Sequence, residues 1–248
     1  MILSCDISKL SAFKNTFIKS FSPSKIIAFS SGGKISKICL ENNIEYRNIQ
    51  KYHSPRASFT SFLYSILKVL KPIIPIEESD ILESLKKLKE MSKKINSNNI
   101  SSNNPSIEIS EWLNNFPIIY YPFGLQSAAI RFKNAIQENA KTHVIIEDII
   151  ESAHNGIVGW DRESSFQPIL LRGSEDGKTT KERWKIIKEF FKSKNIEYKE
   201  IISEDGNILT KIICLIYLFD YSSIFFAVKL KIDPSPVVAI DFIKKRLN

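Results

Sequence analysis

The sequence predicts an α/β protein made of two halves, each a three-layer α/β/α arrangement around a mainly parallel sheet. Short apolar runs alternate with amphipathic stretches along most of the chain, which is the pattern of βα units. A polar, low-complexity stretch at residues 96–104 (NSNNISSNN) separates an earlier series of such units from a later one. The chain has 248 residues, of which 43% are hydrophobic, so it can bury a core and global disorder is excluded.

The first series contains a strand, a helix, a second strand and two further helices. They are expected at residues 25–30, 34–42, 44–49, 57–70 and 77–95. The first strand ends in Ser31-Gly32-Gly33, where glycine allows a tight turn into the following helix. The last helix repeats its apolar residues every three or four positions, opposite its charges, so one of its faces is expected to be buried.

The second series contains four strands and four helices. The strands are expected at residues 117–121, 142–147, 167–171 and 196–201, and the helices at residues 125–140, 180–193, 209–230 and 237–247. The most apolar of these helices includes Lys211 and Asp220, so we expect a buried helix rather than a membrane span. The expected domains are residues 1–95 and 105–248, with residues 96–104 as the linker. Ligands of such folds bind at the carboxyl ends of the strands.

The charge and the cysteine content of the chain indicate which kind of partner it binds and in which cellular compartment it is expected. A formal charge of +8 favours anionic partners, although a well-solvated lysine-rich surface gives the same count. No run of Lys and Arg interleaved with aromatic residues is present, so a nucleic-acid partner is not expected. Cys5, Cys39 and Cys214 lie far apart, which indicates a reducing interior without disulfides. The N-terminus does not read as a secretory signal, so a cytoplasmic location is expected.

Two charged residues oppose the dipole of the helix that carries them. Arg56 follows Pro55 in the first turn of a helix, and Glu138 lies near the end of another. Arg56 is either an anion clamp or a surface residue paired with a carboxylate. Glu138 is either a base with a raised pKa or an exposed residue of a helix end.

The histidines are candidates of unequal interest. His154 follows a strand, in a segment where Gly156 and Gly159 permit a tight backbone, and it could shuttle a proton near neutral pH. His143 is expected inside a strand with a structural role. The basic residues at 244–246 match the dipole of a terminal helix, which is ordinarily a solvated face. No cluster of Asp, His or Cys indicates a metal site.

Taken together, these segments resemble the bifunctional phosphoglucose/phosphomannose isomerases, a family of the sugar isomerase (SIS) superfamily. The resemblance covers the chain from about residue 25 to its end, with several motifs in the same order and spacing. They are Ser30-Ser31-Gly32-Gly33-Lys34, Pro55-Arg56-Ala57, Arg131-Phe132-Lys133, Glu138-Asn139-Ala140-Lys141, His154-Asn155, Val158-Gly159-Trp160, Leu170-Leu171-Arg172, Asp233-Pro234 and Ile243-Lys244.

The resemblance implies isomerisation of glucose 6-phosphate or mannose 6-phosphate to fructose 6-phosphate through a cis-enediolate, without metal or cofactor. Glu138 would move the proton between C1 and C2, and Arg56 would stabilise the enediolate oxygen. His154 and Lys244 would assist ring opening, with the histidine supplied across the interface of a homodimer. The local register favours Lys244 over Lys245.

The sequence departs from the family in its phosphate-binding segments. The family's first βα unit, with its Gly-Gly-Ser loop, has no counterpart, so the first half is expected to be incomplete. The family's second loop, Ser-x-Ser-Gly-Asn-Thr, aligns with residues 4–9, where Ser4 matches but Asp6, Ile7 and Lys9 do not. Ile7 blocks close approach of the backbone to a phosphate, and Asp6 repels it. The substrate-binding candidates are Ser4, Lys9, Ser31, Gly32, Gly33 and Lys34.

Three functions remain open on the sequence alone. The first is an active isomerase with a rebuilt phosphate site, lined by Lys9, Lys34 or Arg47. The second is a catalytically impaired relative that binds a sugar or another metabolite, or that acts as a regulatory subunit. Retention of Arg56, Glu138, His154 and Lys244 favours the first reading, and loss of the phosphate loops favours the second. The family also has Glu at position 156, where this sequence has Gly, so an acid that could orient the imidazole would be absent. The third is a basic nucleic-acid-binding protein, which no reader motif supports.

Overall fold

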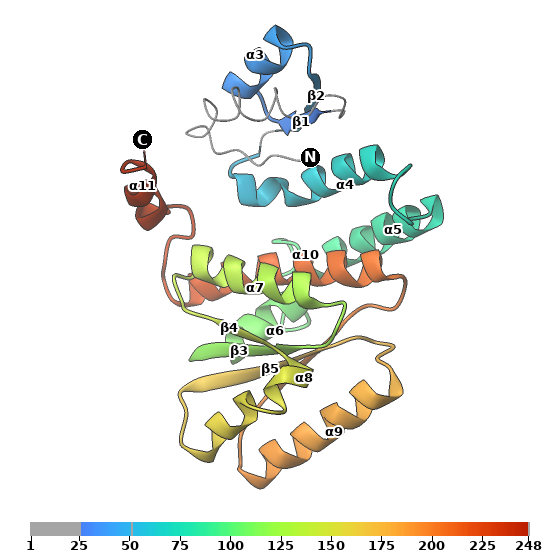
Figure 1. Ribbon diagram of the computed structural model, residues 1–248. Coiled ribbons are helices and arrows are strands. Elements are labelled where there is room, and N and C mark those ends of the chain that lie inside the picture. Colours follow the sequence, from blue (N-terminus) through green and yellow to red (C-terminus); the bar gives the residue numbers. More distant parts are fainter. Residues whose placement is uncertain (1–25, 51, 248) are drawn as a thin grey trace. The chain divides into compact units, whose positions relative to one another are not determined.

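The chain folds into two compact units, one of them interrupted in sequence by the other. The structure is a computed structural model that describes residues 26–50 and 52–247. The first unit comprises Met1–Pro75 and Val237–Asn248, and the second unit is the continuous stretch Ile76–Pro236. Each unit contains its own parallel sheet, which confirms the predicted α/β class (Figure 1).

The sheet of the second unit has four parallel strands in the order β4-β3-β5-β6. Its members are β3 (Phe116–Tyr121), β4 (Ile145–Asp148), β5 (Phe166–Arg172) and β6 (Lys199–Ile202). The chain passes from β3 to β4 on one side and then crosses to β5 on the other. The strand order therefore reverses between β3 and β5, the place where open α/β sheets bind ligands.

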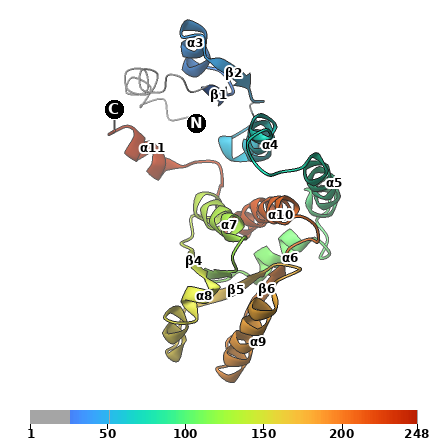
Figure 2. The ribbon, with the colours of Figure 1, turned by 45° about the vertical axis from the view of Figure 1, so that its right-hand side comes forward.

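Helices cover both faces of this sheet (Figure 1 and Figure 2). One face carries α7 (Gln126–Asn139) and α10 (Ile208–Lys229), backed by α5 (Glu78–Ile95) and α6 (Pro105–Trp112). The other carries α8 (Ile149–Ser152), the 3-10 helix η4 (Gly156–Asp161) and α9 (Lys178–Ser193). Successive side chains of a strand point to opposite faces of the sheet. Because β3 and β5 have consecutive buried residues, both faces of the sheet are apolar there and each is covered by helices.

The core on the α9 face is aromatic. Tyr120 from β3 and Leu170 from β5 pack there with Trp160 of η4 and with Trp184 and Phe191 of α9. Trp160 and Phe191 meet edge to face, with ring centroids 5.4 Å apart. This packing fixes η4 on the sheet, although the helix is short.

Helix α10 is the core helix of the other face. It is the one helix in the described part of the chain that is long and apolar enough to cross a membrane. It packs instead against α5, α6 and α7. This packing agrees with the prediction of a buried helix. The two charged residues of the helix have partners: Lys211 pairs with Glu175 at 2.8 Å, and Asp220 pairs with Arg131.

The sheet of the first unit has two parallel strands, β1 (Ile27–Ser30) and β2 (Glu45–Asn48), joined by α3 (Lys34–Glu41). The chain continues through the 3-10 helix η3 (Pro55–Ser58) into α4 (Phe59–Leu70). Helix α11 (Val238–Lys244) belongs to this unit although it lies near the other end of the sequence.

The domain boundaries differ from those expected at residues 96–104. Helix α5 packs on α10, so it belongs to the second unit, and the polar stretch is a connection inside that unit. Asn104 is fully buried there, and its side chain accepts a hydrogen bond from Ser106 N at 2.9 Å, which caps α6. Polar composition marked a turn and a helix cap at this point, not a domain boundary.

Candidate functional site

Glu138 lies in the last turn of α7, where hydrogen bonds and an ion pair join this helix to α10. Arg131 donates two hydrogen bonds to the Asp220 carboxylate, each 2.8 Å long, and Asn139 Nδ2 donates to Ser223 Oγ at 2.8 Å. Burial raises the pKa of Asp220; the pair with Arg131 opposes that rise, and the charge of Glu138 adds to it. The half-buried Glu138 carboxylate is thus held close to a second acid on a fixed helix end.

His154 lies between α8 and η4, on a turn that is tied down on both sides. Asp148 caps α8 by accepting from Ile150 N at 2.8 Å, and Asn155 Nδ2 donates to Glu151 Oε1 at 2.7 Å. On the other side, Trp160 Nε1 donates to Tyr120 Oη at 2.8 Å. The side chain of His154 itself is exposed. The turn therefore presents an imidazole on the surface of the second unit from a rigid base.

A carboxylate lies under this turn, in the space that a side chain at position 156 would occupy. Glu147, on β4, places Oε2 2.2 Å from where a Cβ of residue 156 would stand. That oxygen is buried and has no hydrogen-bond partner among the described residues. Residue 156 lacks an acid, as the sequence indicates, but the turn does not, because β4 supplies one. The sequence could not reveal this, since the two positions meet only through the fold.

Burial of Glu147 predicts a pH-dependent stability. Burial raises the pKa of this carboxyl in the folded protein above its value in the unfolded chain. The contribution of Glu147 to the free energy of unfolding is therefore complete below about pH 4, where the group is protonated in both states. It is lost as the pH rises through the raised pKa, because the buried group must then ionise. Replacing Glu147 with Gln should leave the melting temperature unchanged near pH 4. At pH 7 the substitution should raise the melting temperature by about 2 °C, which corresponds to about 1 kcal/mol of unfolding free energy.

Thermal unfolding of both proteins at pH 4 and pH 7 checks this. The matched control is Glu163→Gln, which removes an exposed carboxylate and should change neither value. A lower melting temperature of Glu147→Gln at pH 7 would contradict the expected cost of burying this charge.

Glu138 and His154 lie on opposite faces of the sheet of one chain. Helix α7, which carries Glu138, covers one face together with α10, and the turn bearing His154 leads into η4 on the other face. Trp160 of η4 belongs to the cluster on the α9 side, which fixes this assignment. The helix end that carries Glu138 and the turn that carries His154 are therefore separated by the sheet within the second unit.

The other two catalytic candidates belong to the first unit. Arg56 lies in η3 directly after Pro55, as the sequence predicts, and its side chain is half-buried. Lys244 is the last residue of α11, and Lys245 follows it. Both lysines are exposed, so their burial does not decide between them.

Four of the six substrate-binding candidates lie at the carboxyl end of β1, where Ser31, Gly32 and Gly33 form the turn and Lys34 begins the next helix. Gly32 and Gly33 have φ angles of 114° and 76°, which glycine adopts without strain. Ser30 Oγ donates to Gly32 O at 3.1 Å, and α3 starts at Lys34. The turn therefore leads Ser31 to Lys34 into a helix N-terminus, as predicted. Ser4 and Lys9 lie outside the described residues.

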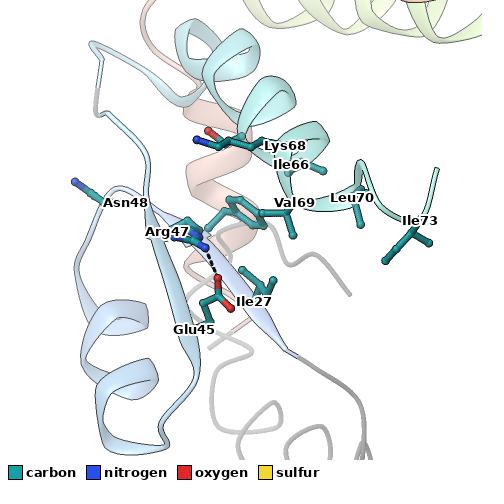
Figure 3. A pocket seen from close by; sticks show the side chains of 11 residues that line it. Ile27, Glu45, Arg47, Asn48, Ile66, Lys68, Val69, Leu70 and Ile73 are labelled. Carbon is teal, nitrogen blue, oxygen red and sulfur yellow. Dashed lines mark hydrogen bonds and ion pairs between the residues drawn. The ribbon is translucent and has the colours of Figure 1, made fainter. Parts of the chain in front are cut away.

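A cavity of about 590 Å³ lies in the first unit between the two-stranded sheet and α4 (Figure 3). Ile27, Phe29 and residues of α4 give it apolar walls, and Arg47 and Lys68 add positive charge. Arg47 forms an ion pair with Glu45 on the same strand. Of the residues proposed for a rebuilt phosphate site, Arg47 lines this cavity, whereas Lys34 is not among the described residues that do. Sequence reasoning missed Lys68, a lone charge on an otherwise apolar stretch of α4.

The positions of His143 and of the described cysteines can be compared with the predictions of a structural histidine and of free thiols. His143 precedes β4 and is exposed, so the prediction that it lies inside a strand was wrong. Cys39 and Cys214 are buried and unpaired, and burial raises the pKa of Cys214 to about 12. Within the described part of the chain, no group of three His, Cys, Asp or Glu side chains could hold a metal ion.

Known proteins resemble this chain in sequence and in fold. Residues 102–247 match the family described as "Bacterial phospho-glucose isomerase C-terminal SIS domain". The "Bifunctional phosphoglucose/phosphomannose isomerase" of Caldicellulosiruptor bescii is 30% identical over 247 residues, which is 96% of this chain and 72% of that protein. The protein of the same name from Aquifex aeolicus is 25% identical over 90% of this chain and 68% of its own length.

The fold comparison agrees with the sequence comparison. A glucose-6-phosphate isomerase-like protein from Thermus thermophilus superposes with a TM-score of 0.65, covering 91% of this chain and 79% of that one at 12% identity. At that identity the likeness concerns the fold alone. Together with the sequence matches, it establishes that this chain belongs to the bifunctional phosphoglucose/phosphomannose isomerase family of SIS-domain proteins.

Proposed function

We propose that this protein is an aldose–ketose isomerase that converts glucose 6-phosphate or mannose 6-phosphate to fructose 6-phosphate. The observation that carries the proposal is the position of Glu138. Its carboxylate lies at the end of α7, which is attached to α10 by the Arg131–Asp220 ion pair and by the Asn139–Ser223 hydrogen bond. The chain is also a member of a family of isomerases. A proton-transferring carboxylate must be held within hydrogen-bond reach of the carbon it serves, and such a frame provides that precision.

The proposed reaction needs one base and one fixed cation. Glu138 takes the proton from C2 of the open-chain aldose, which leaves an enediolate, and returns a proton to C1. Arg56 lies near the start of α4 and stabilises the negative oxygen of the enediolate. His154 and Lys244 move protons during ring opening. Only side chains take part in these steps.

The complete site is proposed to need two copies of the chain. Helix α7, which carries Glu138, and the 3-10 helix η4, which follows His154, cover opposite faces of the sheet in one copy, so we propose that the imidazole comes from another. The exposed His154, on a turn fixed by Asn155–Glu151 and Trp160–Tyr120, is suited to reach a neighbouring molecule. We therefore propose a homodimer in which each site takes its histidine from the partner.

The phosphate is proposed to bind in the first unit. The turn from Ser31 to Lys34 offers backbone donors at a helix N-terminus. The cavity beside α4 offers Arg47 and Lys68 against the single negative charge of Glu45. We also propose a cytoplasmic location, which the buried, unpaired thiols of Cys39 and Cys214 support.

An assay of fructose 6-phosphate formation tests the function. The protein should convert glucose 6-phosphate and mannose 6-phosphate, and Glu138→Gln should lower kcat by about a thousandfold. Glu182→Gln is the matched control, because it removes an exposed carboxylate of α9 and should keep full activity. Equal turnover by Glu138→Gln and the unmodified protein would overturn the proposed base.

A binding function without catalysis is the second candidate. Asp6 and Ile7 favour it, because they stand where the family has residues that hold phosphate. A thermal-shift series with phosphosugars, unphosphorylated sugars and DNA separates the candidates, since a ligand that binds the native state raises the melting temperature. A shift with a phosphosugar but no turnover would support the binding protein. A shift with DNA alone would support a nucleic-acid partner.

A further inference from the structure

Helix α10 carries an acid at the place where the last turns of α7 pack on it. Arg131 of α7 pairs with Asp220 of α10. Further along both helices, Asn139 Nδ2 donates to Ser223 Oγ at 2.8 Å, and Ser223 Oγ donates to the carbonyl oxygen of Asp220 at 2.7 Å. Glu138 precedes Asn139, so it lies beside the turn of α10 that begins at Asp220. Two acids from two helices thus come together at the end of α7.

Arg131 lies on the same face of α7 as Glu138. The two residues are seven positions apart, which is nearly two turns of an α-helix, so their side chains project from the same side. The Arg131 guanidinium donates to both oxygens of Asp220 at 2.8 Å, and the side chains of this pair are 19% and 25% exposed. Salt screens such a partly buried pair only weakly. Asp220 therefore meets a cation and a second acid from one face of the neighbouring helix.

The pKa of Asp220 reflects this arrangement. Burial raises the pKa, the pair with Arg131 lowers it, and the charge of Glu138 raises it. Among the residues that the structure describes, Arg131 and Glu138 are the two charged residues that shift this pKa. The repulsion between two carboxylates is mutual, so a negative charge on Asp220 also disfavours a negative charge on Glu138.

Other titratable groups lie around the two acids. Tyr217 of α10 is close by, and burial is the main cause that raises its pKa. The Lys141 ammonium, beyond the end of α7, donates to the backbone oxygen of Glu138. Of the strands that pack on α7, β3 has no charged residue, and the acids of β4 are Glu147, which lies under η4, and Asp148, which caps α8. Within the described residues, none of these groups forms an ion pair with the α10 carboxylate.

Two neighbouring carboxylates resist being charged together, and one of them takes up a proton at a higher pH than it would alone. A base that accepts a proton from carbon must itself be ionised. We propose that Arg131 is a positioning residue that acts through Asp220: by holding and neutralising the Asp220 carboxylate, it keeps Glu138 ionised near neutral pH. The kinetic consequence rests on the proposed isomerase function, whereas the compensation of charge can be tested without turnover.

The dependence of kcat/KM on pH tests the proposal. Arg131→Met leaves Asp220 without its cation, so the acid side of the profile, where Glu138 becomes protonated, should move up by about one pH unit. A merely structural loss would lower kcat/KM by the same factor at every pH. Arg172→Met is the matched control, because Arg172 forms an ion pair with Glu200 and these side chains are also 19% and 25% exposed. It should leave the position of the acid side unchanged.

Two further variants test the sign of the effect. Asp220→Asn leaves the guanidinium without its carboxylate, so the acid side should move down by about half a pH unit. Arg131→Met combined with Asp220→Asn removes both charges and should return the acid side to within about 0.3 pH unit of its unmodified position. An acid side that stays in place in Arg131→Met, or a shift that persists in the double variant, would overturn the proposal. If Arg131→Met does not fold, an upward or absent shift in Asp220→Asn overturns it.

Carbon-13 NMR of the glutamate carboxyl groups tests the compensation of charge without any assay of turnover. The Glu138 signal is identified by its loss in Glu138→Gln, and its titration midpoint should move in the three variants in the same directions as the kinetic profile. Unchanged midpoints would overturn the proposal. Midpoints that move in a protein that converts neither sugar phosphate would support the role of Arg131 and show that the proposed function fails.

Discussion

Mixing two inactive variants, Glu138→Gln and His154→Ala, should restore about a quarter of the unmodified activity. After random exchange of subunits, half of the dimers contain one copy of each variant. In such a dimer one site combines both substitutions, and the other combines an intact Glu138 with an intact His154. The recovery follows from the proposed homodimer, in which each site takes Glu138 from one chain and His154 from the other.

Subunit exchange at several mixing ratios, followed by the fructose 6-phosphate assay, checks this result. The matched control mixes Glu138→Gln with Glu138→Ala, where every site lacks the base and no recovery is expected. Native mass spectrometry shows whether mixed dimers form. Mixed dimers that have no activity would contradict a histidine supplied by the partner.

Replacing Phe132 with Ala should cost about 3–5 kcal/mol of unfolding free energy. Phe132 of α7 stacks on Phe219 of α10 with ring centroids 4.0 Å apart and planes 7° from parallel, and both side chains are fully buried. The lost ring leaves a cavity between α7 and α10, which pack against each other on one face of the sheet. A loss of this size is a large part of the roughly 5–15 kcal/mol that typically stabilises a folded protein.

Urea unfolding measures the loss as a shift of the midpoint at constant slope. Phe123→Ala is the matched control, since Phe123 is 94% exposed in the loop after β3 and its removal should change the free energy by less than about 0.5 kcal/mol. Equal effects of the two substitutions would contradict the packing of α7 on α10.

The sequence predicted the regular elements that carry their own apolar period. Every expected strand from residue 25 onward exists, and α10 is a buried helix although its composition would suit a membrane. Helix α6 was missed because Asn104 and Pro105 look like loop residues until Asn104 is seen to cap the helix. The family resemblance singled out Glu138 and His154. The structure has Glu138 in the last turn of α7, as predicted, whereas His154 follows β4 only after the short helix α8, which the sequence did not predict.

The candidate site was harder to predict because its arrangement depends on crossovers. Sequence order does not say that Glu138 and His154 end on opposite faces, since that depends on the side on which each connection packs. The approach of Glu147 to Gly156 depends on how β4 and η4 meet. Local propensity also says nothing of Lys141, whose contacts with Pro234 and Pro236 span most of the second unit.

The insertion of the second unit into the first has a consequence for synthesis on the ribosome. Ile76–Pro236 is continuous, so it can fold as soon as it has emerged. The first unit includes residues on both sides of it, and its α11 is made only after residue 236. Residues 1–75 must therefore wait through the synthesis of the whole second unit before the first unit can be completed. The unit that carries Arg56 and Lys244 is thus the last to be completed.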